Sequence, residues 1–240
     1  MLVTALPDDG GGRKLDDVHW GMSVLLIASG VATGLLARIP LRAAVAPVAA
    51  WPVAVLSAAA LAVVASRLQA GGWPARWLPV PWVLTVFAVP LALADLRHRR
   101  LPDVLTLPAY PAIAAALAAA AWADTALGVR AALGVVVFGV AHAVLHLCSP
   151  ASLGAGDVKL AGSLGAVLAA VGWPAVVLGA VAAALLSAAL AAAGAVRRFL
   201  RPAAGQSSAA RGVPHGPGLL AATWLFAVFP APGSGVAGRW

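Results

Sequence analysis

The chain of 240 residues contains no glutamate, and its only acidic side chains are eight aspartates. Charged residues make up 10% of the sequence and hydrophobic residues 62%. A soluble domain averages about 25% charged and about 45–50% apolar residues. The shortage of charge therefore excludes an ordinary soluble domain and indicates a polytopic membrane protein.

Cysteine is nearly absent as well. The single Cys148 excludes an internal disulfide and a multi-cysteine zinc site. The formal net charge is +8, but the basic residues lie in short loops between apolar runs. There they serve to orient membrane spans, so we expect no nucleic-acid partner. The sequence also predicts no metal ion and no cofactor.

The apolar runs predict the fold. About 20 apolar residues cross the hydrocarbon core of a bilayer as a helix. Eight runs approach that length: 18–37, 43–66, 79–95, 104–123, 127–147, 157–172, 174–196 and 217–231. We expect an all-α transmembrane bundle of about eight spans. Residues 1–17 would form an extracytoplasmic tail, 18–231 the membrane domain, and 232–240 a C-terminal tail.

The loop charges predict the orientation of the bundle. With the N-terminal tail outside, the inner segments hold ten of the 16 lysines and arginines. The positive-inside rule favours this arrangement in an inner (plasma) membrane. It places residues 95–103, 148–159 and 197–216 on the cytoplasmic side. Tryptophans near run ends, including Trp73 and Trp77, are expected in an interfacial belt.

A first acidic motif spans the end of the third run and the start of the fourth. Asp95 ends the third run, where the helix dipole disfavours an anion. Either it pairs with a neighbouring arginine or it has a chemical role. Pro102 and Asp103 follow, and Asp103 fits an N-cap of the next helix.

A second motif, Gly154-Ala155-Gly156-Asp157-Val158-Lys159-Leu160, begins the sixth run. A carboxylate kept in a membrane segment is by default a functional-site hypothesis. Gly154 and Gly156 allow backbone geometries closed to other residues and leave room for a substrate strand. The structural alternative is that Asp157 caps the helix while Lys159 extends to the headgroups.

Two carboxylates at the same ends of different helices can form an acid–base pair. Like charges held close cannot both ionise easily, so one pKa rises. One aspartate then activates water and the other protonates the carbonyl or the leaving amine. His142 and His146 also share a helix face. Hydrogen bonding between helices or a metal pair would explain them, but no third metal ligand is obvious.

Asp95-x5-Leu101-Pro102-Asp103 followed by Gly154-x-Gly156-Asp157-x-Lys159-Leu160 resembles the type IV prepilin peptidase family, which are intramembrane aspartyl proteases of the GxGD type. A third string, Val213-Pro214-His215-Gly216-Pro217, is similar to the weaker motif of that family before its last helix. The three motifs occur in the family's order.

The resemblance implies that Asp95 and Asp157 are the catalytic pair. It implies supporting or substrate-binding roles for Pro102, Asp103, Gly154, Gly156, Lys159, Pro214, Gly216 and Pro217. The implied substrate is a type IV prepilin or pseudopilin, with a short basic leader before a hydrophobic helix. The leader would be removed at the cytoplasmic face.

Long members of the family carry a cytoplasmic insertion with paired CxxC motifs, associated with N-methylation of the trimmed product. Here only residues 39–42 connect the first two runs, and the chain has one cysteine. We therefore expect a peptidase without methyltransferase activity. Two alternatives stay open: a transporter or assembly scaffold without catalysis, and a GxGD protease that cuts another substrate, such as a preflagellin.

Overall fold

The computed structural model describes residues 10–44, 46–150, 153–200 and 215–236, and these residues form helices and no strands. The order is α1 (Gly10–Leu36), α2 (Arg38–Ala43), α3 (Ala50–Gln69), the 3-10 turn η1 (Ala75–Trp77), α4 (Pro79–His98), α5 (Asp103–Ala121), α6 (Thr125–Cys148), α7 (Ala155–Val171), α8 (Trp173–Leu200) and α9 (Gly216–Val228). The predicted all-α class is confirmed, and each of the eight expected runs is found as a helix.

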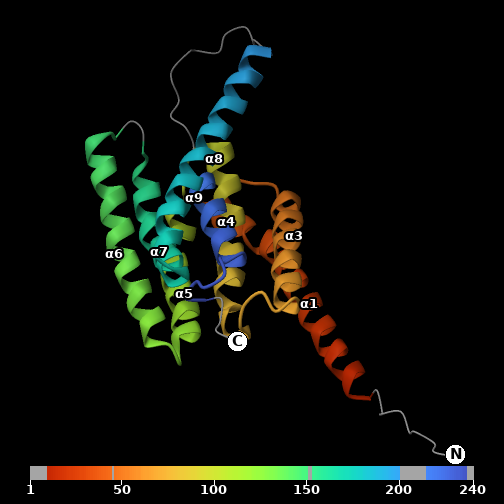
Figure 1. The fold of residues 1–240 in the computed structure, drawn as a ribbon. Coiled ribbons are helices and arrows are strands. Elements are labelled where there is room, and N and C mark those ends of the chain that lie inside the picture. The colour runs from red at the N-terminus through yellow and green to blue at the C-terminus, as the bar shows by residue number, and fades with distance from the viewer. Residues whose placement is uncertain (1–9, 45, 151–152, 201–214, 237–240) are drawn as a thin grey trace, which may run out of the picture.

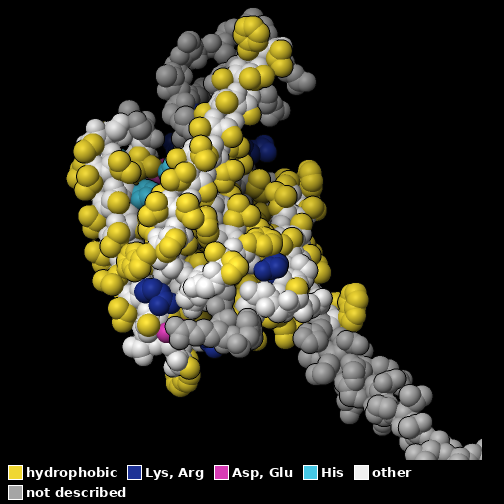
Figure 2. Space-filling view, in the orientation of Figure 1, with side chains coloured by type: hydrophobic (Ala, Val, Ile, Leu, Met, Phe, Trp, Pro, Cys, Tyr) yellow, Lys and Arg dark blue, Asp and Glu magenta, His cyan; other side chains and the backbone are white. Residues whose placement is uncertain are grey.

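The helices form one bundle. α1 and α3 lie side by side at one edge, α5, α6 and α7 at the other, and α4, α8 and α9 lie between them (Figure 1). Hydrophobic side chains cover the flank of the bundle (Figure 2). Examples are Leu25, 72% exposed, and Val177, 65% exposed. Such surfaces suit lipid rather than water.

Six helices of the described chain are long and apolar enough to cross a membrane: Trp20–Ala43, Ala50–Gln69, Ala75–His98, Asp103–Ala121, Thr125–Cys148 and Trp173–Val196. The other two expected runs are shorter helices, α7 with 17 residues and α9 with 13. Every residue of α7 from Leu160 to Val171 is buried. A helix enclosed by its neighbours touches little lipid, so it need not match the bilayer thickness.

Two predicted boundaries are wrong at the N-terminal end. α1 begins at Gly10, before the run expected from residue 18, although its candidate membrane span begins only at Trp20; residues 1–9 lie outside the described part, and the extracytoplasmic place of residues 1–17 stays a prediction. The second run was expected from residue 43, but α3 begins at Ala50. The short α2 and an extended stretch that contains Pro47 intervene. Proline restricts the residue before it, which delays the helix.

Close packing of α6 on α7 fixes the centre of the bundle. A Cβ atom on Gly134 would collide with the carbonyl oxygen of Gly165, and a Cβ on Gly165 would collide with Phe138. Small residues thus let these two backbones approach. α7 is held in the middle of the bundle, and its first turn lies at the end where α6 ends and α5 begins.

The interfacial interpretation of two tryptophans is wrong. Trp73 and Trp77 are each 1% exposed. Their Nε1–H groups donate hydrogen bonds to the carbonyls of Val228 (3.2 Å) and Ala227 (2.9 Å) at the end of α9. The last carbonyls of a helix have no partner inside it, so these indoles satisfy groups that would otherwise be orphaned. Trp122 is 92% exposed, and its place in an interfacial belt stays a prediction.

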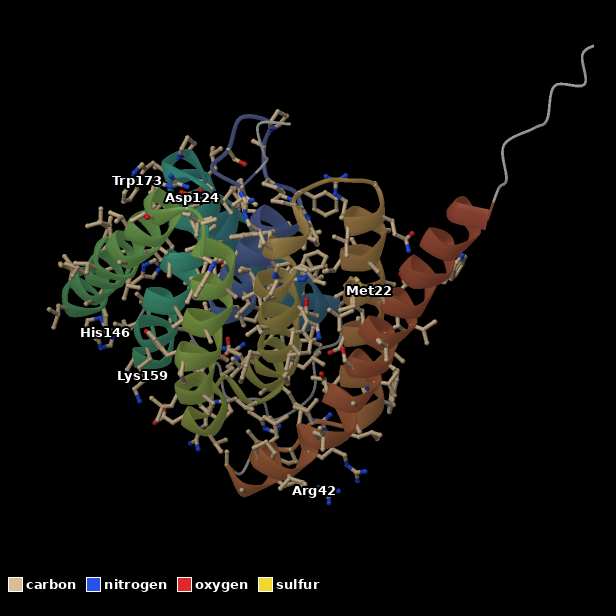
Figure 3. The ribbon with its side chains drawn as sticks, turned by 90° about the horizontal axis from the view of Figure 1, so that it is seen from below. Met22, Arg42, Asp124, His146, Lys159 and Trp173 are labelled. Atoms are coloured by element: carbon tan, nitrogen blue, oxygen red, sulfur yellow. The ribbon has the colours of Figure 1, made fainter. Side chains whose placement is uncertain are left out.

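The two ends of the bundle differ in side chains. Arg42, His146 and Lys159 lie at one end, and Asp124 and Trp173 at the other (Figure 3). Asp95, Asp103 and Asp157 fall at the first end, at the end of α4 and the starts of α5 and α7.

Candidate active site

Asp95 and Asp157 approach each other at that end. Asp95 lies in the last turn of α4 and Asp157 in the first turn of α7, and both are buried, 7% and 8% exposed. A Cβ atom placed on Gly216 would lie 2.9 Å from Asp95 Oδ2 and 3.2 Å from Asp157 Oδ1. These oxygens are therefore at most about 6 Å apart, the sum of the two distances. The motifs thus meet in space across 62 positions of sequence.

Leu101 packs the three motifs together. The backbone turns after α4 at Arg99, which has a left-handed φ of 53° and donates its N–H to the Asp95 carbonyl at 2.7 Å. Leu101 then reaches the other two motifs. A Cβ on Gly156 would lie 3.0 Å from Leu101 Cβ, and a Cβ on Gly216 would lie 3.3 Å from Leu101 Cδ1. The absence of side chains at these glycines makes room for Leu101.

Gly154 is the N-cap of α7, and Asp157 is its third helical residue. Asp157 Oδ2 accepts a hydrogen bond from the Gly154 N–H at 3.3 Å. This is half of a capping box, because glycine has no side chain to complete it. Gly154 has φ −71° and ψ 148°, an extended conformation that any residue adopts. Gly154 therefore does not use the wider backbone freedom of glycine, and the room that it leaves for a substrate stays a prediction.

Asp157 lies outside the six candidate spans. Burial raises the pKa of its carboxyl group, and the hydrogen bond from Gly154 works in the opposite direction. The Asp157 carboxyl is therefore easier to protonate than one exposed to water.

The third motif supplies a backbone donor to the pair. The Gly216 N–H, at the start of α9, donates a hydrogen bond to the Asp95 carboxylate. The positive end of the α9 dipole therefore faces Asp95. Pro217 occupies the first turn of α9, where its missing N–H costs nothing. Pro214 lies outside the described residues.

Asp103 does not cap α5. Pro102 is the N-cap and no side-chain capping bond is made, so the predicted cap is wrong. Both carboxylate oxygens of Asp103 instead lie 2.9 Å from Lys159 Nζ. The two side chains are about half exposed, so the pair contributes about 1 kcal/mol or less. It joins α5 to α7, and Tyr110 OH adds a hydrogen bond to the Lys159 carbonyl.

A polar cluster that the sequence did not predict lies beside the aspartates. His215 Nδ1 is 3.0 Å from Ser187 Oγ of α8, and its ring centroid is 6.2 Å from that of His142. Burial lowers the pKa of His215, which favours its neutral form. His215 directly precedes Gly216, so its contact with Ser187 helps to fix the start of α9. The only sequence signal for this cluster is the motif around Gly216, which contains His215.

His142 and His146 turn to different partners. His142 Nδ1–H donates to the Phe138 carbonyl at 2.9 Å, and His146 Nδ1–H donates to the Leu153 carbonyl at 2.7 Å. In the part of the chain that the structure describes, no three histidine, cysteine or aspartate side chains gather as a metal site would require. Both histidines thus bond to backbone carbonyls, one within α6 and one in the segment before α7.

The fold and these side chains define a helical membrane bundle with two buried carboxylates at one end. Residues 82–192, from α4 to most of α8, match the model of the type IV leader peptidase family. The match covers a little less than half of the chain, and the matched region is similar to that family. The comparison with curated proteins gave no match, and neither did the comparison with solved structures.

Proposed function

We propose that the protein is an aspartyl endopeptidase that removes the leader peptide of type IV prepilins or pseudopilins at the cytoplasmic face of the membrane. The observation that carries this proposal is the approach of the Asp95 and Asp157 carboxylates to about 6 Å or less around Gly216. Sites without substrate often tighten on binding, so this spacing suits a pair that closes on a water molecule and a peptide.

In the proposed reaction the pair holds one proton. The ionised aspartate takes a proton from water as the oxygen attacks the scissile carbonyl carbon. The protonated aspartate gives its proton to the carbonyl oxygen. As the resulting tetrahedral intermediate collapses, the C–N bond breaks, the leaving nitrogen takes a proton from one aspartate, and the other aspartate takes a proton from a hydroxyl group of the intermediate, so the pair again holds one proton. Because the carboxylates are coupled, the acid and base roles belong to the pair rather than to either residue.

Pro102, Asp103, Gly154, Gly156, Lys159, Gly216 and Pro217 have supporting roles in this proposal. The family match favours a protease over the transporter or scaffold alternative. Lack of N-methyltransferase activity is part of the proposal. Residues 39–42, where longer members carry the cysteine-rich insertion, lie within the six-residue α2.

The test is co-expression with a prepilin that has a basic leader and a hydrophobic helix. Asp95→Asn and Asp157→Asn should each abolish cleavage, while each protein still inserts into the membrane. Asp124→Asn is the matched control, because Asp124 caps α6 through the Leu127 N–H at the other end of the bundle. Normal cleavage by either variant of the pair would exclude the proposed chemistry.

If the wild-type protein cleaves no prepilin or pseudopilin, the result would favour the alternative of a transporter or scaffold without catalysis. Mass spectrometry of the mature product tests the second part of the proposal. We expect an unmodified amino terminus, and a methylated one made by this protein alone would contradict the single activity.

A further inference from the structure

A basic cavity lies near the active-site end of the bundle but on a different side of α4. Its volume is about 510 Å³, within the range of roughly 300–1,000 Å³ common for ligand pockets. Arg38 and Arg42 of α2 and Arg97 of α4 line it, together with residues 47–51 before and at the start of α3. Arg97 follows Asp95 by two positions, so the two side chains leave α4 in different directions.

No carboxylate of the described residues offsets this charge. The ion pair found among them joins Lys159 to Asp103, and neither residue lines the cavity. Three guanidinium groups therefore face one space without an acidic partner. Guanidinium groups bind phosphate oxygens with two parallel hydrogen bonds, which makes arginine suited to phosphate recognition.

The start of α3 adds donors to the same cavity. Its N-cap, Ala49, makes no side-chain capping bond, and Ala49, Ala50 and Trp51 line the cavity. Uncapped N–H groups and the helix dipole favour an anion there. His98 Nε2–H donates to the Pro47 carbonyl at 2.9 Å. This bond ties the loop before α3 to the end of α4 and holds the two walls of the cavity together.

Apolar side chains stand beside the charges. Trp51, which lines the cavity, and Ile39, which follows Arg38 in α2, are each 72% exposed. Tryptophan is enriched where a membrane meets water, and the apolar residues suit acyl chains. The cavity therefore combines a site for a phosphate with a surface for lipid tails. Basic pockets between transmembrane helices bind acidic lipid headgroups in this way.

We propose that this cavity binds the phosphate of an anionic phospholipid, with the acyl chains against Trp51 and the neighbouring exposed Ile39. A basic leader peptide would be repelled by three arginines, so the cavity is distinct from the place where such a substrate reaches Asp95 and Asp157. The bound lipid would stabilise the α2–α3 connection against α4. This proposal does not depend on the proposed proteolytic function.

The test uses the full chain in detergent and native mass spectrometry with phosphatidylglycerol and phosphatidylcholine of equal chain length. The wild type should retain phosphatidylglycerol in preference. Replacing Arg38, Arg42 and Arg97 by glutamine should reduce its retention by about fivefold for each arginine removed. Two single variants are matched controls: Arg100→Gln, at the same end but outside the cavity, and Arg76→Gln, in η1. Both should retain the lipid as the wild type does.

Replacement of the same three residues by lysine keeps the charge and should keep most of the preference, which guards against a glutamine variant that fails to fold. Unchanged phosphatidylglycerol retention by a folded glutamine variant would overturn the proposal. Equal loss in the Arg100→Gln control would also overturn it, because general surface charge would then explain binding. Inorganic phosphate that displaces the lipid at millimolar concentration would assign the cavity to a free anion. A glutamine variant that keeps the lipid but loses prepilin cleavage would also overturn the proposal, because the cavity would then serve the substrate.

Discussion

The α-carbon of Gly216 faces both carboxylates of the proposed catalytic pair. A Cβ atom there would lie 2.9 Å from Asp95 Oδ2 and 3.2 Å from Asp157 Oδ1. The first distance is shorter than real Cβ contacts, so a side chain at residue 216 must displace at least one carboxylate or the start of α9. In the proposed site, the third motif therefore contributes a backbone donor and the absence of a side chain.

Gly216→Ala should consequently lower kcat by up to about 100-fold, the effect of a displacement of about 1 Å in a catalytic site. The protein should still insert and remain folded. Gly128→Ala is the control, since the nearest atom to its added Cβ, on Ala121, is 3.6 Å away. A Gly216→Ala variant with wild-type kcat would show that the site tolerates the methyl group and that the carboxylates are not held as the structure places them.

The pH dependence of activity should show at which pH the proposed catalytic pair loses its shared proton. The proposed reaction needs one protonated and one ionised aspartate, so kcat/KM should fall as pH rises through the higher apparent pKa of the pair. Burial raises the pKa of Asp157 from its ordinary value of 3.8. The alkaline limb should therefore lie above that value. Burial lowers the pKa of His215, so this histidine is neutral at pH values where an ordinary one begins to lose its proton.

Gly154→Pro moves the same limb in a defined direction. The backbone angle of Gly154, φ −71°, suits proline, which lacks the N–H that now bonds to ionised Asp157. Loss of that bond disfavours the ionised form, so the alkaline limb should move to higher pH. Gly154→Ala keeps the N–H and should leave the limb in place. If the alkaline limb of the proline variant stays at the wild-type pH, then Asp157 is not the group whose titration controls activity.

The Asp103–Lys159 ion pair is a support whose worth can be measured. Both side chains are about half exposed, so a double-mutant cycle with Asp103→Asn and Lys159→Met should give a coupling of about 0.2–1 kcal/mol in unfolding free energy. Each single variant should lower kcat/KM by about fivefold or less. A much larger loss in Lys159→Met than in Asp103→Asn would mean that Lys159 also contacts the substrate.

The sequence predicts the parts of this molecule that the bilayer dictates. Long apolar runs become helices because no other element satisfies its backbone groups in lipid, so α3 to α6 were found within a few residues, apart from the start of α3. Asp95 and Asp157 stood out for the same reason, since charge is rare in such runs. The prediction that Asp103 caps α5 is wrong because Pro102 takes the cap position. The Asp103 carboxylate is then free to pair with Lys159 on α7.

Local sequence patterns do not predict contacts between segments that are distant in the sequence. His215 meets Ser187, 28 positions earlier, and Trp77 meets Ala227, 150 positions later. Nothing near Trp77 in the sequence separates an indole that caps a distant helix from one that lies at the membrane surface. Both occur at the end of an apolar run, and burial alone distinguishes them.

Trp77→Phe tests the buried role directly. The change keeps an aromatic ring but leaves the Ala227 carbonyl without its donor at the end of α9. An unsatisfied buried acceptor costs about 1–3 kcal/mol, so the variant should unfold at a lower temperature in detergent than the wild type. Trp122→Phe, at a site 92% exposed, should lie within about 0.5 kcal/mol of the wild type. Because α9 begins at Gly216, a loosened α9 should also lower activity near the unfolding transition. Equal stability of the two variants would show that the indole bonds to α9 do not hold that helix in place.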